Sequence, residues 1–468
     1  MAVQLKEPLD QLIKQPTFFT KGKHFLVPEK IKIYDDTLRD GEQMPGVAFS
    51  PEQKLEMAKL FSQLGVHVMD VAFPTVSESE RKAVQLCLQA QEKGTIRKDI
   101  EILAMCRAVN SDIDCVLETV REISLPPESV SVLILSTTSD LHLKYKLGKV
   151  FLKREGRKEE EWLSTPLEFY RAANIKMITS AISYARSKGL KKIEFATEDA
   201  SRADLSYLLQ WGKACIEAGG TRLCFSDTVG CLTPEAVDHY FPPIVEMTTK
   251  KGVELHAHFH NDFGMGASNC VRALSHGASH AGVTMCGIGE RAGNAPLEQV
   301  VMQLKLLYGI ELPGFRYDLL VRLRQLIESY SGIPIQPHMP IVGEGVFYHE
   351  SGIHTAGIAI HPLIYQFIPE ELVGGKRRFV FGKHTGTVAV EEVLKKYERD
   401  LKNVGISITD ELVKKLVDQI KDLREKEIAT DQTQSLIKAY YGNYYSLGIS
   451  EEQLLGLALK TGAKTASV

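Results

Sequence analysis

The chain has 468 residues, 44% of them hydrophobic, which is enough for one large buried core and a smaller second one. Lys and Arg total 56 against 59 Asp and Glu, giving a net charge of -3 that argues against nucleic acids and anionic membranes as partners. Apolar runs stay well short of the roughly 20 residues that cross a bilayer, and the N-terminus lacks a signal-peptide core. We therefore expect a cytoplasmic protein that acts on small molecules and keeps its eight scattered cysteines reduced.

From residue 31 to about 310, short β-rich runs alternate with amphipathic helical segments, as in repeated βα units around a parallel sheet. The strands are expected at 31–39, 67–73, 100–106, 129–137, 192–197, 222–228, 253–260 and 281–288. The helices between them include 51–64, 77–93, 167–188 and 234–251. Eight such units predict an α/β fold of the (β/α)8 TIM-barrel class. A doubly wound sheet is the alternative, but residues 37–43 (TLRDGEQ) are not the Gly-rich phosphate turn that it favours after the first strand.

The chain is expected to divide into four parts. These are an N-terminal extension (1–30), the barrel (31–310), a linker or subdomain (311–390) and a helical C-terminal subdomain (391–468), with helices near 388–402 and 410–425. A strongly charged segment, 149–162, follows the fourth strand and is predicted to be a solvated loop or lid extension.

The seventh predicted strand carries histidines at alternating positions. Because side chains alternate along a strand, His258 and His260 share the face that points into the barrel, near its C-terminal end, where TIM-barrel active sites lie. A lone histidine is usually structural, but two such imidazoles favour a metal site, with His256 a structural residue one step deeper. Asp40, closing the first predicted strand, adds a carboxylate, and Asn294 in the eighth unit adds an amide oxygen. These ligands suit a divalent Mg, Mn, Zn or Co ion.

Other polar side chains close strands at the same end of the barrel. Arg39 supplies a permanent cation beside Asp40, Glu198 ends the fifth strand and Thr228 ends the sixth. We therefore expect these groups to share one site with the metal ligands.

Several phrases together resemble the acyl-CoA condensing synthases of the DRE-TIM metallolyase superfamily. They are 36–43 (DTLRDGEQ), 258–262 (HFHND), 289–295 (GERAGNA), 351–354 (SGIH) and 382–386 (GKHTG), so the resemblance spans about residues 31–390. That group includes 2-isopropylmalate, homocitrate, citramalate and (Re)-citrate synthases. The resemblance implies a metal-dependent condensation of acetyl-CoA with a 2-oxo acid, followed by thioester hydrolysis.

The resemblance also implies roles for individual residues. Asp40, His258, His260 and Asn294 would hold the metal, and Arg39 would polarise the ketone of the 2-oxo acid.

By the same resemblance, Glu198 would help to hold the substrate and the acetyl-CoA enol, and Thr228 would bind the carboxylate of the 2-oxo acid. His354 would be the catalytic base, with Tyr365 as its aromatic partner. In relatives the last two residues come from the partner subunit, so the resemblance implies a homodimer.

The acceptor is left open by mixed features. Residues 142–147 (HLKYKL) resemble isopropylmalate synthases, whereas 73–78 (FPTVSE) and 349–354 (HESGIH) resemble homocitrate synthases. Arg107 and His142 could pair with a second carboxylate, which favours a dicarboxylic acceptor such as 2-oxoglutarate or oxaloacetate. The alternative acceptors are 2-oxoisovalerate and a citramalate-type acceptor. Two other functions are also considered: a metal-dependent acyl-CoA or oxo-acid lyase, and a non-catalytic metal-binding sensor.

Overall fold

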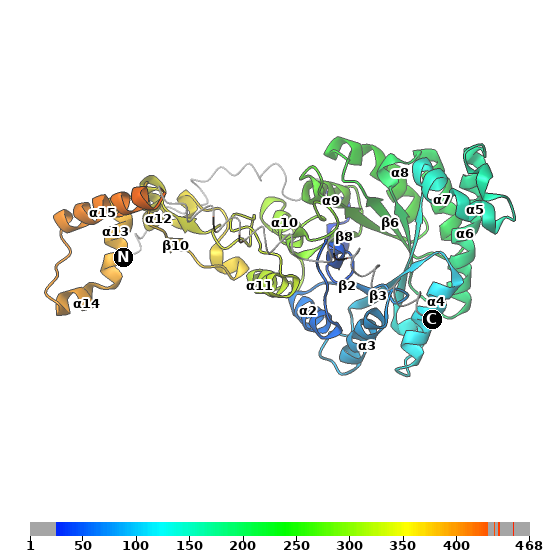
Figure 1. The fold of residues 1–468 in the computed structure, drawn as a ribbon, viewed down its shortest axis with the longest axis horizontal. Coiled ribbons are helices and arrows are strands. Elements are labelled where there is room, and N and C mark those ends of the chain that lie inside the picture. The colour runs from blue at the N-terminus through cyan, green and yellow to red at the C-terminus, as the bar shows by residue number, and fades with distance from the viewer. Residues whose placement is uncertain (1–24, 429–434, 436–438, 440–452, 454–468) are drawn as a thin grey trace. The chain divides into compact units, whose positions relative to one another are not determined.

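The computed structural model describes residues 25–428 and the single residues 435, 439 and 453 (Figure 1). Two compact units are present, and each is described by itself. Within the range 25–428, the barrel unit comprises residues 25–316 and 323–331, and the second unit comprises residues 317–322 and 332–428. Most of the predicted N-terminal extension, and the predicted helical subdomain beyond residue 428, lie outside the described residues.

The barrel unit is the predicted TIM barrel, a closed ring of parallel strands in the order β1 to β8. The ring closes where Lys32 to Asp35 of β1 pair with His280 to Val283 of β8. The strands are β1 (Lys32–Asp35), β2 (Val68–Ala72), β3 (Glu101–Arg107), β4 (Ser131–Thr137), β5 (Ile193–Glu198), β6 (Arg222–Asp227), β7 (Glu254–Phe259) and β8 (His280–Val283). All eight predicted strands are therefore confirmed, with shifted ends.

The first strand is shorter than predicted, because the chain turns directly after Asp35. The Asp35 carboxylate accepts hydrogen bonds from the backbone N–H and the hydroxyl of Thr37, at 3.1 and 2.9 Å. Such a side-chain turn competes with continued strand pairing. Arg39 and Asp40 consequently lie in the loop after β1, not on the strand, and Gly41–Gln43 forms a 3-10 turn.

Helices cover the outside of the ring, as Figure 1 shows. They are α2 (Pro51–Leu64), α3 (Glu78–Glu92), α4 (Asn110–Arg121), α6 (Leu167–Ser187), α7 (Leu205–Glu217), α8 (Pro234–Thr249), α9 (Gly266–Ser275) and α10 (Leu297–Met302). The start of α2 shows why prediction succeeds here, since Ser50 and Gln53 form a capping box and Pro51 follows. Among the described helices, none combines the length and apolar character needed to cross a membrane.

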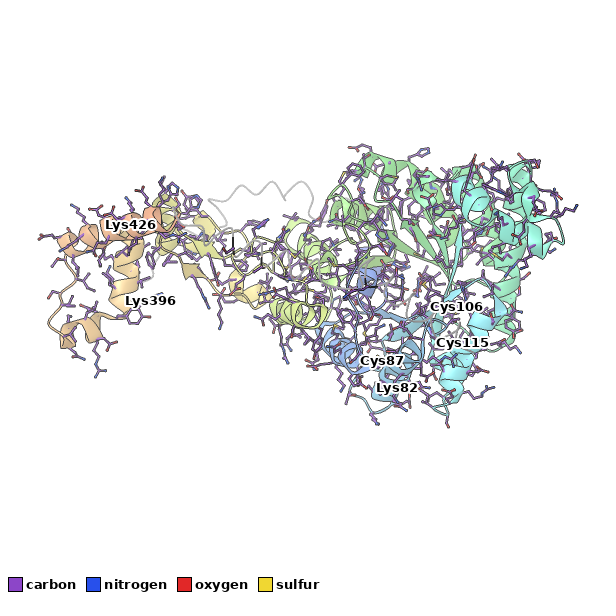
Figure 2. The ribbon with its side chains drawn as sticks, viewed as in Figure 1. Lys82, Cys87, Cys106, Cys115, Lys396 and Lys426 are labelled. Atoms are coloured by element: carbon purple, nitrogen blue, oxygen red, sulfur yellow. The ribbon has the colours of Figure 1, made fainter. Side chains whose placement is uncertain are left out.

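All eight cysteines carry free thiols, and seven of them are buried. Cys87, Cys106 and Cys115 lie within the barrel unit, on α3, β3 and α4 (Figure 2). They act there as small apolar core residues.

The charged segment 149–162 is not the predicted loop. It contains helix α5 (Gly148–Arg154) and a 3-10 turn at Glu159–Trp162. The reason is its apolar pair, since Phe151 and Leu152 are buried at 1% and 0% exposure while the charges face outward. A π-helical turn at His142–Lys146 precedes α5.

The second unit is smaller and mostly helical, as predicted. It contains α12 (Gly352–Ile360), the two-stranded sheet of β9 (Tyr348–His349) and β10 (Arg378–Phe379), and helices α13 (Thr387–Lys396), α14 (Glu398–Asn403) and α15 (Asp410–Ile428). Val390, Val413 and Val417 form its buried cluster. Helix α11 (Leu320–Ser331) crosses the boundary between the units.

A buried ionic network fills the interior near the N-terminal ends of the strands. Arg222 donates to Glu101 at 2.7 Å and to Glu194 at 2.5 Å, and Glu194 also contacts Nδ1 of His256 at 2.8 Å. The imidazole of His256 has room because β8 carries Gly282 beside it. A Cβ at position 282 would lie 2.3 Å from Nε2 of His256.

Candidate active site

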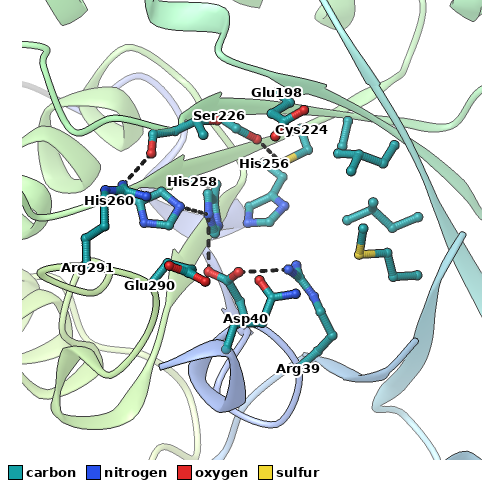
Figure 3. A pocket seen from close by; sticks show the side chains of 16 residues that line it. Arg39, Asp40, Glu198, Cys224, Ser226, His256, His258, His260, Glu290 and Arg291 are labelled. Atoms are coloured by element: carbon teal, nitrogen blue, oxygen red, sulfur yellow. Dashed lines mark hydrogen bonds and ion pairs between the residues drawn. The ribbon is translucent and has the colours of Figure 1, made fainter. Parts of the chain in front are cut away.

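A cavity of about 280 Å³ lies at the C-terminal half of the barrel strands (Figure 3). Six of the predicted site residues line it, namely Arg39, Asp40, Glu198, Thr228, His258 and His260. The strand periodicity and the strand ends thus converge on one cavity, as the TIM-barrel prediction requires.

Three predicted metal ligands present their ligand atoms to one point. Atoms of Asp40, His258 and His260 all lie within 4.8 Å of one another, and the three residues are buried. Nε2 of His258 is 3.4 Å from Nε2 of His260 and 3.7 Å from Oδ2 of Asp40, as the dashed lines in Figure 3 trace. The fourth, Asn294, donates to Asp40 at 2.8 Å, and its own Oδ1 is buried without a hydrogen-bond partner among the described residues.

The electrostatics of this group favour a cation. Asp36 contacts Nδ1 of His258 at 3.1 Å. Burial lowers the pKa of His258, but Asp36 and Asp40 outweigh burial and produce a net rise. A metal at Nε2 of His258 would take the place of a proton there, while Asp36 would accept the proton on Nδ1. Burial, followed by the neighbouring His258, lowers the pKa of His260 to about 4. Burial alone would raise the pKa of Asp40, but Arg39 and the two histidines outweigh it and lower that pKa to about 2. A neutral imidazole and a carboxylate are the forms that bind metal, so these residues fit a divalent ion.

Arg39 is held beside the metal ligands by carboxylates. Its guanidinium donates to Asp70 at 2.7 Å and to Asp40 at 2.9 Å, and it lies 3.6 Å from Asp36. Burial raises the pKa of Asp70, an effect that the charge of Arg39 opposes. Asp70 is not among the residues that the sequence predicts for the site, although an aspartate in the middle of the buried strand β2 needs a partner.

Glu198 and Thr228 occupy the ends of β5 and β6. Lys146 donates to Glu198 at 2.5 Å, and the His142 ring lies 3.6 Å from both Glu198 and Asp199. Burial raises the pKa of Glu198, but the nearby His142 and the hydrogen bond from Lys146 produce a net lowering. The Thr228 oxygen accepts the Asp199 N–H at 2.8 Å, so its own hydroxyl proton remains available to donate.

Arg107 is not brought into the cavity. Its side chain is 60% exposed and forms a two-point ion pair with Asp112 at 2.8 and 2.9 Å. The lining residues that were not predicted as site residues include four with long or hydroxyl-bearing polar side chains, namely Gln43, Ser226, Glu290 and Arg291. The GERAGN phrase could have suggested the last two, because it lies in the loop after the last barrel strand.

His354 and Tyr365 belong to the second unit. Their rings stack at a centroid distance of 4.3 Å, with an interplanar angle of 25°. His354 is exposed, and 43% of Tyr365 is exposed. The predicted base and its aromatic partner are thus a preformed pair.

A TIM barrel with a histidine, carboxylate and amide cluster at its C-terminal face defines the class as a barrel enzyme with a candidate metal site. The family model described as HMGL-like matches residues 30–157 and 160–327, and the model described as homocitrate synthase post-HMGL domain-like matches residues 341–428. The chain belongs to the HMGL-like family.

Relatives with curated names are synthases. A probable 2-isopropylmalate synthase of Methanopyrus kandleri is 38% identical, over 86% of this chain and 71% of its own length. A homocitrate synthase of Methanothermobacter thermautotrophicus is 37% identical, over 87% and 93% respectively. An (R)-citramalate synthase of Methanocaldococcus jannaschii is 36% identical, over 84% and 70%. These relatives confirm the resemblance to condensing synthases, and the chain is an enzyme of this kind.

Solved structures agree with the barrel fold. An HMG-CoA lyase from Acenitobacter baumannii, solved with coenzyme A and 3-methylmalate, matches with a TM-score of 0.50 at 16% identity. The match covers 65% of this chain and 92% of the lyase chain, and it bears on the fold alone.

Proposed function

We propose that this enzyme condenses acetyl-CoA with a 2-oxo acid and then hydrolyses the thioester, releasing CoA. The observation that supports this most directly is the shared cavity, where Asp40, His258 and His260 converge beside Arg39 and Glu198. A ketone bound there would lie close to the guanidinium of Arg39, the metal-binding residues and the carboxylate of Glu198.

The residues of the cavity divide the work on the 2-oxo acid. Asp40, His258, His260 and Asn294 would hold the metal, and a divalent ion there would act as a Lewis acid toward the ketone. Arg39, fixed by Asp70, would donate to the ketone oxygen and stabilise the alkoxide that develops on it. The free hydroxyl proton of Thr228 would donate to the substrate carboxylate.

The bond-forming step requires a base. His354 would accept a proton from the methyl group of acetyl-CoA, with Glu198 steadying the enol, and the new carbon–carbon bond would form to the ketone carbon. The alkoxide would then take up a proton. Water would cleave the thioester, giving a carboxylate and free CoA. We further propose that this chemistry takes place in the cytoplasm.

The second unit is proposed to act on a partner copy of the chain. Exposed apolar side chains lie close to His354 and Tyr365 in the sequence, with Ile353 at 74%, Ile360 at 52% and Phe367 at 46% exposure. Exposed apolar side chains that form a patch are typical of a contact surface. A homodimer in which His354 and Tyr365 reach the partner's barrel would cover it.

The sequence favours a dicarboxylic acceptor, with 2-oxoisovalerate or a citramalate-type acceptor as alternatives. Arg107 gives that preference little support, because its guanidinium is bound to Asp112 and it does not line the cavity. His142 does not line the cavity either, but it lies 3.6 Å from Glu198, which does.

The test is release of CoA, followed with a thiol reagent. The purified chain is supplied with acetyl-CoA and, in turn, pyruvate, 2-oxoisovalerate, 2-oxoglutarate and oxaloacetate, with added Mg, Mn, Zn or Co and with EDTA. We expect acceptor-dependent thiol that EDTA abolishes and metal restores. Thiol release that no acceptor stimulates, under any metal, would contradict the proposal.

A further inference from the structure

The cavity has one apolar wall, made by neighbouring strands. Met105 on β3, Leu133 and Leu135 on β4 and Ala196 on β5 all line it. The strand register pairs Met105 with Leu133 and Leu135 with Ala196, so the four side chains lie next to one another. The wall is therefore a continuous patch and not a set of scattered contacts.

Arg39 and the metal ligands stand on the other side of the ring. Arg39 and Asp40 follow β1, and His258 and His260 belong to β7 and its end, whereas Glu198 ends β5, two residues beyond Ala196. In a closed eight-stranded barrel, β3 to β5 face β7, β8 and β1 across the interior. A 2-oxo acid whose ketone and carboxylate meet the polar side therefore directs its remaining carbon chain toward the apolar wall.

A second carboxylate on that chain would find the nearby cations already paired. Arg107 binds Asp112, Lys146 binds Glu198 and Arg291 binds Asp262. Nδ1 of His142 is buried without a hydrogen-bond partner among the described residues, but the His142 ring lies 3.6 Å from both Glu198 and Asp199. Moving one of these basic groups to the substrate would take it from its present carboxylate, and the cost is highest for the fully buried Asp112 and Asp199.

His256 also lines the cavity, and its Nε2 is buried without a hydrogen-bond partner among the described residues. That atom lies beside Gly282 of β8 and 3.9 Å from Oδ2 of Asp36. It thus stands on the polar side, next to another carboxylate, and away from the wall formed by β3 to β5. It does not supply the cation that a second substrate carboxylate would need.

We propose that the acceptor is a monocarboxylic 2-oxo acid with a short or branched aliphatic chain, and that Leu133 and Met105 set the length of that chain. This inference rests on the condensing function proposed above. It replaces the dicarboxylic acceptor that the sequence favours, because Arg107 is bound outside the cavity.

The test compares kcat/KM for CoA release with pyruvate, 2-oxobutyrate and 2-oxoisovalerate against 2-oxoglutarate and oxaloacetate, using the metal-loaded full chain. We expect the best aliphatic acceptor to exceed both dicarboxylic acids by at least about 100-fold. A dicarboxylic acid that equals or exceeds it would overturn the acceptor inference and leave the condensing function intact. No release with any acceptor would overturn the function. In that case, calorimetry would compare the affinities of the same five acids for the cavity. Tighter binding of a dicarboxylic acid than of the aliphatic acids would refute the acceptor inference.

A matched pair of variants tests the wall itself. Leu133→Ala enlarges the cavity, whereas Leu103→Ala removes a side chain of the same buried cluster that does not line it. We expect Leu133→Ala to shift the kcat/KM ratio of 2-oxoisocaproate to pyruvate by about 10-fold toward the longer acid, and Leu103→Ala to leave it within about twofold. Equal ratios in the two variants would refute the role of Leu133. Should Leu133→Ala fail to fold, Ala196→Val narrows the same wall and should disfavour 2-oxoisovalerate relative to pyruvate, while an unchanged ratio would count against the wall.

Discussion

Asp36 contacts Nδ1 of His258 at 3.1 Å, on the side of the ring opposite the nitrogen that would bind the metal. Carboxylates in this position fix the tautomer and orientation of a metal-binding imidazole, and losing one typically weakens metal affinity about 10–100-fold. We expect Asp36→Ala to show that loss in competition with a chromophoric chelator. Asp36→Asn, which keeps an acceptor oxygen, should recover part of the affinity.

Asp35 offers the matched control for Asp36. It is an equally buried carboxylate one position earlier, and its hydrogen bonds go to Thr37. Asp35→Asn should therefore leave metal affinity within about threefold of the parent. Unchanged affinity in Asp36→Ala, or an equal loss in both variants, would show that Asp36 does not position His258.

At the scale of single residues, the sequence predicts the metal ligands better than it predicts the residues that hold the site side chains in place. The alternating histidines and the Asp40 phrase are readable because ligands repeat at short, regular spacing. Asp70 and Lys146 are not, because they meet Arg39 and Glu198 across 31 and 52 residues of chain. Such contacts depend on how neighbouring strands and their loops lie side by side, which no local pattern encodes.

At the scale of elements, helix α2 is tied to the loop that carries Asp40. Lys54 on α2 is fully buried and contacts Glu42 at 2.6 Å and Glu80 at 2.5 Å. Burial raises the pKa of Glu42, and the charge of Lys54 opposes that rise. Lys54→Met would leave two carboxylates unpaired, and we expect it to cost about 3–5 kcal/mol of unfolding free energy in a urea titration. Lys59→Met, on the same helix, should cost less than about 1 kcal/mol, and a similar cost for both would contradict this account.

Helix α10 carries a buried acid that makes stability depend on pH. One oxygen of Glu298 accepts the Cys286 N–H at 3.0 Å, the other has no hydrogen-bond partner within the described chain, and burial raises the pKa of the carboxyl to about 7. The unfolded chain releases this proton near pH 4.3, whereas the folded chain keeps it until about pH 7. The contribution of Glu298 to stability is therefore fully present below about pH 4 and is lost, by about 3 kcal/mol, as the pH rises to about 7.

Glu298→Gln removes this dependence while keeping an acceptor oxygen for Cys286. Relative to the parent, its unfolding free energy should rise by about 3 kcal/mol between pH 5 and pH 8, as urea titrations at the two values would show. A difference that does not vary with pH would mean that Glu298 does not titrate in this range.

The elements themselves were largely predictable. Helix α2 matches its prediction at both ends, because a capping box and Gly65 mark them in the sequence. The first strand was extended too far, since an Asx-type turn at Asp35 is hidden inside an apolar and charged run. The sequence predicts a loop at 149–162 because charged residues are far more numerous there than the two apolar residues that become buried, Phe151 and Leu152.

At the scale of the whole molecule, the residues proposed to take part in the reaction are distributed over two units of the chain. The metal ligands belong to the barrel unit, and His354 and Tyr365 belong to the second. If the second unit of one chain contributes His354 to the barrel of a partner copy, Asp40→Ala removes a metal ligand from its own barrel, whereas His354→Ala removes the base from the partner's site. Each variant alone should lose more than about 99% of turnover, because each lacks one essential part.

Mixing the two inactive variants tests this division. After co-expression or subunit exchange, we expect CoA release to recover to about a quarter of the parent value, since half the dimers are mixed and each of those holds one intact site. His354→Ala alone should still bind the 2-oxo acid in calorimetry. No recovery in mixtures that demonstrably form mixed dimers would show that each chain completes its own site.

Gly282 has a consequence beyond the room that it gives to His256. With a Cβ predicted 2.3 Å from that imidazole, any larger residue at 282 excludes histidine at 256 unless the strands move apart. A Cβ there would also lie 2.9 Å from the backbone oxygen of Ala257, so a smaller side chain at 256 would not by itself make room for it. The dependence between the two positions therefore runs one way: related barrels with this strand spacing should keep glycine at 282 whatever residue stands at 256, and should carry histidine at 256 only together with that glycine.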